Sequence, residues 1–274
     1  MKNKGILYIC PTPIGNLKDI TFRAIELLNK VDLVLCEDTR TSQKLLNHYS
    51  ISAKTISYHK FNEKQSAQNI ISLLIEGKNI ALISDAGTPI ISDPGAELLK
   101  CAIENKIKII PLAGASALTT FMSGVFNPCG QFLFLGFAPK KQSEKETILR
   151  KYKNLTTVFY ESPNRLLKTL ETLKEIMPDA QVAVGRELTK LYEEIKQGAI
   201  SEILSYYKQN PPKGEIVLAI IASEQSENEI NLEEQILKLN EQGYSINDIS
   251  KIISTLFGAS KKEVYNLALN LCRK

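Results

Sequence analysis

Several residue types that carry recognisable chemistry are scarce in this sequence of 274 residues. It has no tryptophan, two histidines and five cysteines, and the cysteines lie far apart with no CxxC pair. Zinc sites and disulfide frameworks need cysteine or histidine at set spacings, so the sequence supports neither. We therefore expect no metal, and the scattered cysteines are typical of a protein of the reducing cytoplasm.

An excess of charge of one sign is also missing. Lys and Arg number 34 against 30 for Asp and Glu, which gives a net charge of +4. This excess is too mild to indicate a nucleic-acid partner by itself, so any basic surface has to be local. The uncharged stretch 109–139 is broken by prolines and glycines, which predicts buried strands and a helix and no membrane span.

Two common phosphate-binding motifs, GxGxxG and GxxxxGK[ST], are absent, which disfavours dinucleotide and nucleoside triphosphate chemistry. Short apolar runs instead alternate with helical patterns, which is typical of an α/β protein with largely parallel sheets. The predicted strands are 6–10, 33–37, 80–84, 107–112, 132–135, 157–160, 181–184 and 215–222. Asp93-Pro94 and Ser162-Pro163 predict helix starts, each with an N-cap side chain followed by proline.

Breaks in this pattern predict three parts of the chain. The pattern restarts near Gly124, which predicts one α/β domain over 1–123 and a second over 124–223. The polar, acidic stretch 223–231 is typical of a linker. A C-terminal segment, 229–274, is predicted to hold three short helices, the last two joined around Gly258 as in a helix-turn-helix. Its balanced charge favours packing or RNA docking over DNA recognition.

Three of the predicted strands are followed by loops of small residues. The loops are PTPIGN from Pro11, SDAGTP from Ser84 and AGASA from Ala113. In open α/β sheets, ligands bind beyond the carboxyl ends of the strands. Small side chains let backbone groups approach a ligand, and Asp85 can accept hydrogen bonds from ribose hydroxyls or an ammonium group. Each loop alone is explained by a tight turn, but three at one edge predict a site for a charged, nucleoside-bearing cofactor.

The third loop also resembles part of a hydrolase nucleophile elbow around Ser116. The pattern GxSxG fails at its fifth position, which is Leu118. Both histidines, His48 and His59, precede Ser116, whereas hydrolases of this type place the histidine downstream. A hydrolase is therefore disfavoured.

Charged residues follow three other predicted strands. The first group is Asp38 and Arg40, the second is Glu161 alone, and the third is Arg186, Glu187 and Lys190. Each cluster has two interpretations, a capped helix start or a polar group at the mouth of the cleft. In the second interpretation the acids accept a proton and the cations bind phosphate. The densest basic stretch, 140–153, with Lys140, Lys141 and Lys145, is either a solvated face or a track for a phosphate backbone.

Several motifs taken together resemble one family. They are PIGNLKDIT from Pro13, EDTR from Glu37, SDAGTPIISDPG from Ser84, FYESPNRLL from Phe159 and GRELTK from Gly185, in this order over nearly the whole chain. The sequence resembles the ribosomal RNA small subunit methyltransferase I family of the tetrapyrrole methylase superfamily. The PIGN loop departs from the glycine-rich first loop of porphyrin-modifying members, and Ala113 stands where proline is more usual.

The resemblance implies two α/β domains of the tetrapyrrole methylase type with the cofactor cleft between them, and a helix-turn-helix-like tail. It implies S-adenosylmethionine-dependent 2′-O-methylation of a cytidine ribose in the decoding centre of 16S rRNA. The implied partners are 16S rRNA or the 30S subunit and a second copy of the chain. The cofactor contacts that it implies are Ile14, Asp85, Ala86, Gly87, Thr88, Ser116, Ala117, Tyr160, Glu161 and Ile216.

A ribose hydroxyl has to lose its proton during such a reaction, so a base within hydrogen-bond reach is expected. The candidates are Asp38, Glu161 and Glu187, with Arg40, Lys140, Lys141, Lys145, Arg186 and Lys190 as RNA contacts. Two alternatives stay open. One is a methyltransferase of the same fold that acts on a small molecule, and the other is a non-catalytic RNA-binding assembly factor.

Overall fold

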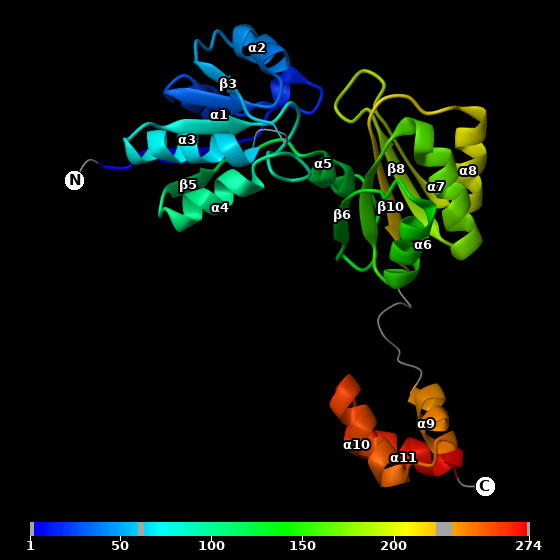
Figure 1. The fold of residues 1–274 in the computed structure, drawn as a ribbon. Helices are drawn as coiled ribbons and strands as arrows, with labels where there is room; N and C mark the ends of the chain where they lie inside the picture. The colour runs from blue at the N-terminus through cyan, green and yellow to red at the C-terminus, as the bar shows by residue number, and fades with distance from the viewer. Residues whose placement is uncertain (1–2, 60–62, 223–231, 273–274) are drawn as a thin grey trace. The chain divides into compact units, whose positions relative to one another are not determined.

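The computed structural model describes residues 3–59, 63–222 and 232–272. These residues form two compact units, one over 1–222 and one over 223–274 (Figure 1). The predicted linker, 223–231, lies outside the described residues. The two sheets described below both belong to the first unit, and the domain boundary near Gly124 remains a prediction.

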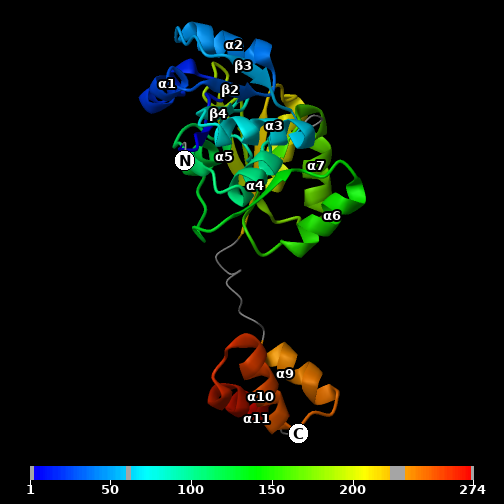
Figure 2. The same cartoon turned by 60° about the vertical axis from the view of Figure 1, so that its left-hand side comes forward.

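The first sheet has five parallel strands in the order β3-β2-β4-β1-β5. They are β1 (Ile6–Cys10), β2 (Leu33–Cys36), β3 (Thr55–Ser57), β4 (Ile80–Ile83) and β5 (Lys108–Pro111). Helices cover both faces, which explains why β2 and β4 are apolar throughout. Figures 1 and 2 show α3 (Glu63–Ile75) and α4 (Ala96–Glu104) side by side on one face, and α1 (Phe22–Leu28) and α2 (Thr39–His48) lie on the other.

The second sheet has the order β6-β7-β10-β8-β9. Its strands are β6 (Leu133–Phe137), β7 (Thr157–Glu161), β8 (Gln181–Arg186), β9 (Glu194–Ala199) and β10 (Ile216–Ile221). Only β6 and β7 pair in parallel, so the prediction of largely parallel sheets is wrong for this sheet. The reason is the short connection 187–193, because a hairpin of this length joins strands only in antiparallel fashion.

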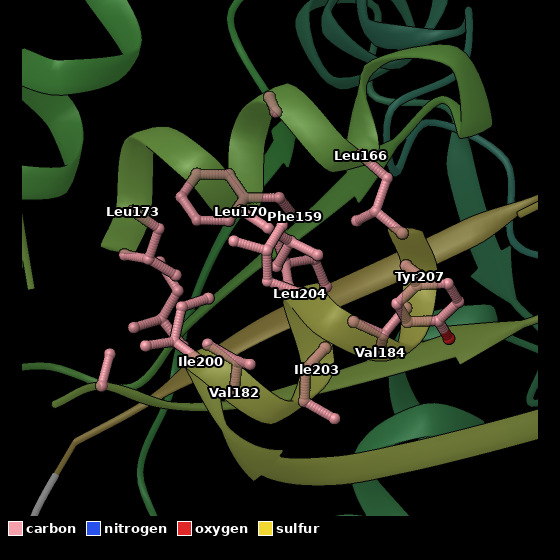
Figure 3. Close-up of a cluster of buried hydrophobic side chains, with 14 of the residues drawn as sticks. Phe159, Leu166, Leu170, Leu173, Val182, Val184, Ile200, Ile203, Leu204 and Tyr207 are labelled. Carbon is pink, nitrogen blue, oxygen red and sulfur yellow. The ribbon is translucent and has the colours of Figure 1, made fainter. Parts of the chain in front are cut away.

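The core of the second sheet follows the two-residue period of its strands. Side chains of one face, such as Phe159 and Val182, pack with α7 (Pro163–Ile176), which contributes Leu166, and with α8 (Ile200–Gln209) in the cluster of Figure 3. The alternate side chains of β7, β8 and β10 pack on the opposite face against Phe121 of α5 (Ala117–Ser123). The remaining helix of this part is α6 (Gln142–Lys151).

The predicted helix starts have different outcomes. The start at Ser162-Pro163 is confirmed, although the Ser162 hydroxyl accepts a hydrogen bond from Arg165 Nε and caps no backbone group. The start at Asp93-Pro94 is wrong, because α4 begins at Ala96 with Gly95 as its N-cap residue. Two strands, β3 and β9, were not predicted from the sequence, since β3 has only three residues and β9 contains two charged ones.

The second unit contains the three predicted short helices: α9 (Leu232–Glu241), α10 (Ile246–Phe257) and α11 (Lys261–Cys272). Ser245 caps α10 by accepting from the N–H of Asp248, as the sequence predicts. Gly258 ends α10 at a φ of +69°, a conformation that favours glycine. In the described ranges of the chain, no helix is both long and apolar enough to cross a membrane.

Candidate functional site

A cavity of about 440 Å³ lies at the carboxyl ends of the first sheet's strands, and residues of the second sheet form part of its wall. Because β4, β1 and β5 are neighbours, the loops that follow them meet at one edge. The volume is within the usual range of small-molecule sites. Every cofactor contact that the resemblance implies lines this cavity: Ile14, Asp85, Ala86, Gly87, Thr88, Ser116, Ala117, Tyr160, Glu161 and Ile216.

Hydrogen bonds fix the three loops relative to one another. Thr12 and Gly87 exchange backbone hydrogen bonds of 2.9 and 3.0 Å, and Gly87 has a φ of +79°. The Ser84 hydroxyl donates to the Gly87 carbonyl at 2.8 Å, and the Thr88 hydroxyl donates to the carbonyl of Ala115 at 3.0 Å. This wall of the cavity is therefore a rigid surface of backbone groups.

The second-sheet wall is held by a buried ion cluster around Glu161 at the end of β7. Glu161 Oε1 accepts from Arg165 Nη2 at 2.6 Å and from the N–H of Ser162 at 2.8 Å. Its Oε2 accepts from the Thr169 hydroxyl at 2.7 Å and lies 3.8 Å from Lys145 Nζ. The carboxylate side chain is 0% exposed, so all of its interactions are with the protein.

The prediction that Lys145 binds RNA is wrong, since its side chain is buried. Lys145 Nζ donates to the Thr169 hydroxyl at 2.6 Å and faces Glu161. Burial lowers the pKa of Lys145, against the opposing effect of the Glu161 charge. The ammonium group therefore holds α6 to the end of β7 and α7, and no phosphate reaches it.

Asp93 lines the cavity although sequence reasoning assigned it a capping role. Glu63 Oε1 takes that role instead, since it accepts from the N–H groups of Gly95 and Glu97 at 2.9 Å each. Burial, followed by the charges of Glu37 and Asp85, raises the pKa of Asp93 to about 6. The signal that sequence analysis could have used is the second acid of SDAGTPIISDPG, placed in the same loop as Asp85.

An aromatic pair stands on the opposite side of the same cavity. Phe137, at the end of β6, lines the cavity and is 62% exposed. Its ring contacts the ring of Tyr160 edge-on, with centroids 5.4 Å apart. Burial, followed by the charge of Asp93, raises the pKa of Tyr160. From the sequence, Phe137 has two interpretations, base stacking beside the basic stretch or core packing as the default, and its exposure contradicts the default.

Asp38 and Arg40 form a capped helix start outside the cavity wall. Asp38 accepts from the backbone N–H of Arg40 at 2.8 Å and pairs with its guanidinium at 2.9 Å. These bonds from Arg40 lower the pKa of Asp38 to about 2. The Arg40 side chain is 88% exposed, so it is accessible to a partner.

The charged cluster that follows β8 also lies beside the cavity, but none of its three residues lines it. They are Arg186, Glu187 and Lys190. Glu187 pairs with Lys190 at 2.9 Å, and this bond is the main cause that lowers its pKa. Lys190 packs against Gly15 of the first loop, whose neighbour Asn16 donates its N–H to the Thr189 hydroxyl. Arg186 Nε lies 3.8 Å from Glu194. These residues connect the loop 187–193 to the first sheet.

Lys140 and Lys141 are exposed residues that follow Phe137. Lys141 pairs with Glu144 at 3.1 Å on the surface. Such a pair contributes little to stability and opens readily for an anionic partner. Of the three lysines named as RNA contacts in the predicted basic stretch, these two have the exposure that such a contact needs, and Lys145 does not.

The chemistry of the cavity wall limits the ligands that fit. Among the described residues, the lining includes no Lys, Arg or His, but it includes four acids: Asp85, Asp93, Glu161 and Glu215. The Ser116 hydroxyl lies in this wall and caps no backbone group of α5. Ile14, Ile216 and Val217 add apolar surface. This combination suits a cationic ligand with hydroxyl groups and an apolar ring, and it disfavours a polyphosphate.

The model of the family described as Tetrapyrrole (Corrin/Porphyrin) Methylases matches residues 6–204. A "Ribosomal RNA small subunit methyltransferase I" of Streptococcus pyogenes serotype M1 is 40% identical over 273 residues, covering 96% of this chain and 94% of that one. The protein of the same name from Bacillus subtilis (strain 168) is 45% identical over 235 residues, covering 84% of this chain and 79% of that one.

Solved structures show the same fold. A crystal structure of diphthine synthase matches with a TM-score of 0.63 and 13% identity, over 80% of this chain and 90% of that one. A uroporphyrin-III-C-methyltransferase from Thermus thermophilus matches with a TM-score of 0.54 and 16% identity, over 79% of this chain and 94% of that one. At these identities the likeness concerns the fold, and function has to be argued from the site.

Proposed function

This chain belongs to the tetrapyrrole methylase family, and within it to the ribosomal RNA small subunit methyltransferase I family, and from this we propose that it methylates 16S rRNA with S-adenosylmethionine. The product is a 2′-O-methylated cytidine ribose in the decoding centre. The observation that carries the proposal is the cavity, because it gathers from both sheets every residue that the family resemblance implies for the cofactor.

The residues present fit this cofactor. S-adenosylmethionine would supply an electrophilic methyl group on a positively charged sulfonium. Asp85 and the Ser116 hydroxyl offer acceptors for its hydroxyl and ammonium groups, and the backbone of 86–88 offers further polar groups. Ile14, Ala117 and Ile216 offer apolar contact for its ring. The absence of basic groups from the described lining favours a cationic cofactor over a phosphorylated one.

Methyl transfer to a hydroxyl depends mainly on alignment of the reacting atoms and exclusion of water. The backbone wall made by Thr12, Gly87 and Thr88 is rigid, and the Glu161 cluster fixes the opposite wall. Neither wall has to reorganise when a substrate enters. We assign Glu161 to this positioning role, since all of its interactions are with the protein.

The RNA would approach over the end of β6. Phe137 exposes a ring at the cavity, and Lys140 and Lys141 follow it on the surface. An exposed ring beside cations suits a nucleotide, since bases stack on aromatic side chains and phosphates pair with lysine. Arg40 is a further exposed cation, while Arg186 and Lys190 hold the loop 187–193. By the same family resemblance, we propose that the active form is a homodimer.

The test is transfer of label from tritiated S-adenosylmethionine to 30S subunits and, in parallel, to naked 16S rRNA. Both substrates come from a strain that lacks this gene, and the label is mapped by nuclease digestion and mass spectrometry. A methyl group on a ribose 2′-oxygen of the decoding region is the expected result. Cofactor binding without any label in RNA would refute the RNA substrate and favour a small molecule.

Calorimetry with S-adenosylmethionine tests the cofactor separately. The D85N variant should bind it at least about tenfold more weakly, because a charged hydrogen bond to an acceptor contributes roughly 1.5–3 kcal/mol. Asp179 is exposed and lies outside the cavity, so D179N is the matched control and should bind normally. Equal affinity of the two variants would remove Asp85 from the cofactor site.

A further inference from the structure

The three acids named as candidate bases are each engaged by partners. Asp38 caps α2 and pairs with Arg40. Glu161 is buried among two cations and two further donors. Glu187 pairs with Lys190 and also accepts from the N–H of Glu215. A carboxylate whose lone pairs are occupied in this way is a poor proton acceptor for a substrate.

Asp93 differs from these acids in having no such partner. Its side chain makes no hydrogen bond or ion pair with any described residue, although it is half-buried and lines the cavity. The backbone donors at the start of α4, which an acid at this position would ordinarily bind, are taken by Glu63. The carboxylate is therefore left free toward the cavity.

The backbone that presents Asp93 is strained. Ile90 and Ser92 have φ values of 75° and 72°, a left-handed conformation that is unfavourable for residues other than glycine. Two such residues within three positions lower the free energy of unfolding, so other contacts of the fold have to offset them. Strain of this kind concentrates at functional sites. Ile91, Ser92 and Asp93, which belong to this segment, all line the cavity.

We propose that Asp93 is the general base of the methyl transfer, an inference that rests on the proposed function. As the ribose 2′-oxygen attacks the methyl carbon, the O–C bond forms and the C–S bond breaks, with its electron pair remaining on sulfur. The hydroxyl proton passes to the Asp93 carboxylate and leaves with solvent after the product departs. The sulfonium becomes a neutral thioether, so charge and atoms balance without another reactant.

The surroundings of Asp93 give it the basicity that this role needs. The titratable groups that face it are Glu37 after β2, Asp85 after β4 and Tyr160 on β7. Burial and the two carboxylates raise its pKa to about 6, so it is ionised at neutral pH and yet binds a proton more tightly than an ordinary aspartate. A base with a pKa near the working pH is the most effective one.

The experiment compares D93N with D85N on 30S subunits and tritiated S-adenosylmethionine. With the cofactor saturating, D93N should lower the single-turnover rate by about 10²- to 10⁴-fold, the usual contribution of a general base. Its dissociation constant for S-adenosylmethionine, measured by calorimetry, should stay within about twofold of wild type. D85N should show the opposite pattern, weak cofactor binding and a rate that recovers at high cofactor concentration. D93E should retain part of the rate.

Two further readouts test the titration of Asp93 itself. Carboxyl ¹³C NMR of the free wild-type protein should show one aspartate, missing in D93N, that titrates near pH 6. The single-turnover rate of the wild type should fall as the pH drops through the pKa of the loaded enzyme, and that of D93N should not. Thermal unfolding of D93N and D85N checks that both variants are folded.

The outcomes separate the two proposals. If wild-type enzyme labels RNA and folded D93N does so at a normal rate, Asp93 is not the base, while the proposed function stands. Weaker cofactor binding by D93N, with a normal rate at saturation, would make Asp93 a cofactor ligand and overturn the inference. If the wild type itself transfers no label to RNA, the proposed function fails whatever D93N does.

Discussion

Each of the two sides of the cavity contains a carboxylate that is at least partly buried, but the charged groups around the two carboxylates differ. On the second-sheet side, Glu161 is neutralised by Arg165 and Lys145 and makes no contact beyond the protein. On the first-sheet side, Asp93 has two carboxylates near it and no donor among the described residues. An acid that supports structure is surrounded by partners, whereas an acid left for a substrate costs stability. Each prediction below tests this contrast.

The largest effect is expected for E161A. Removing this carboxylate leaves the buried charge of Lys145 and the partly buried charge of Arg165 without an anionic partner, which should cost about 3–5 kcal/mol of unfolding free energy. Urea denaturation measures the loss. E144A breaks an exposed pair with Lys141 and should change stability by about 0.5 kcal/mol or less. Similar losses for the two variants would mean that the Glu161 cluster has no structural role.

The next effect concerns the exposed ring on the Glu161 side of the cavity. F137A should weaken RNA binding by about 1–3 kcal/mol, which is roughly 5- to 150-fold, since it removes a surface on which a base can stack. Binding of labelled 30S subunits in a filter assay measures this. Phe132 is also exposed but lies outside the cavity wall, so F132A is the control and should bind normally. A normal affinity for F137A would exclude stacking on this ring.

A smaller effect is expected on the Asp93 side, where backbone groups form the wall. G87A should lose about 1–2 kcal/mol of stability, because the φ of +79° is unfavourable for alanine. Its Cβ would also lie 3.1 Å from Ile14 Cγ2, so cofactor binding should weaken in calorimetry. G130A introduces the same kind of strain at a φ of +65° with no neighbour within 4 Å. G130A should therefore lose stability but keep cofactor affinity.

The smallest effect is a gain in stability for D93N. The pKa of Asp93 is about 6 in the folded protein and about 4 when unfolded, so its ionisation destabilises the fold as the pH rises from 4 to 6. Because solvent screens this partly exposed group, D93N should be more stable than wild type at pH 8 by only about 1 kcal/mol. Near pH 3 the difference should vanish. Urea denaturation at the two pH values checks the sign, and a loss at pH 8 would show that Asp93 has a stabilising partner.

The cavity's first-sheet wall was largely predictable from the sequence. Parallel strands place their following loops at one edge, and PTPIGN, SDAGTP and AGASA all meet there. Their small residues are explained by the close backbone contacts between Thr12 and Gly87. Local sequence rules succeed here because the loop geometry is set by the strands that carry it.

The roles of Asp93 and Lys145 were not predictable in this way. Asp-Pro is a strong local signal for a helix start, and only the position of Glu63 in space removes Asp93 from that role. Lys145 belongs to the densest basic stretch of the sequence, yet it faces Glu161 because that stretch forms α6 against α7. Both cases depend on contacts between distant segments, which composition and spacing do not reveal.

The bond from Glu63 to the start of α4 has a consequence for the order of folding. Glu63 begins α3 and binds backbone groups 32 and 34 residues further along the chain. A non-local contact of this kind forms only after the intervening chain has closed into a loop, so we expect α3 and α4 to dock before the turn that carries Asp93 is fixed. We therefore expect this acidic turn to become ordered after the strands of the first sheet, so a folding intermediate with those strands formed would still lack the proposed base.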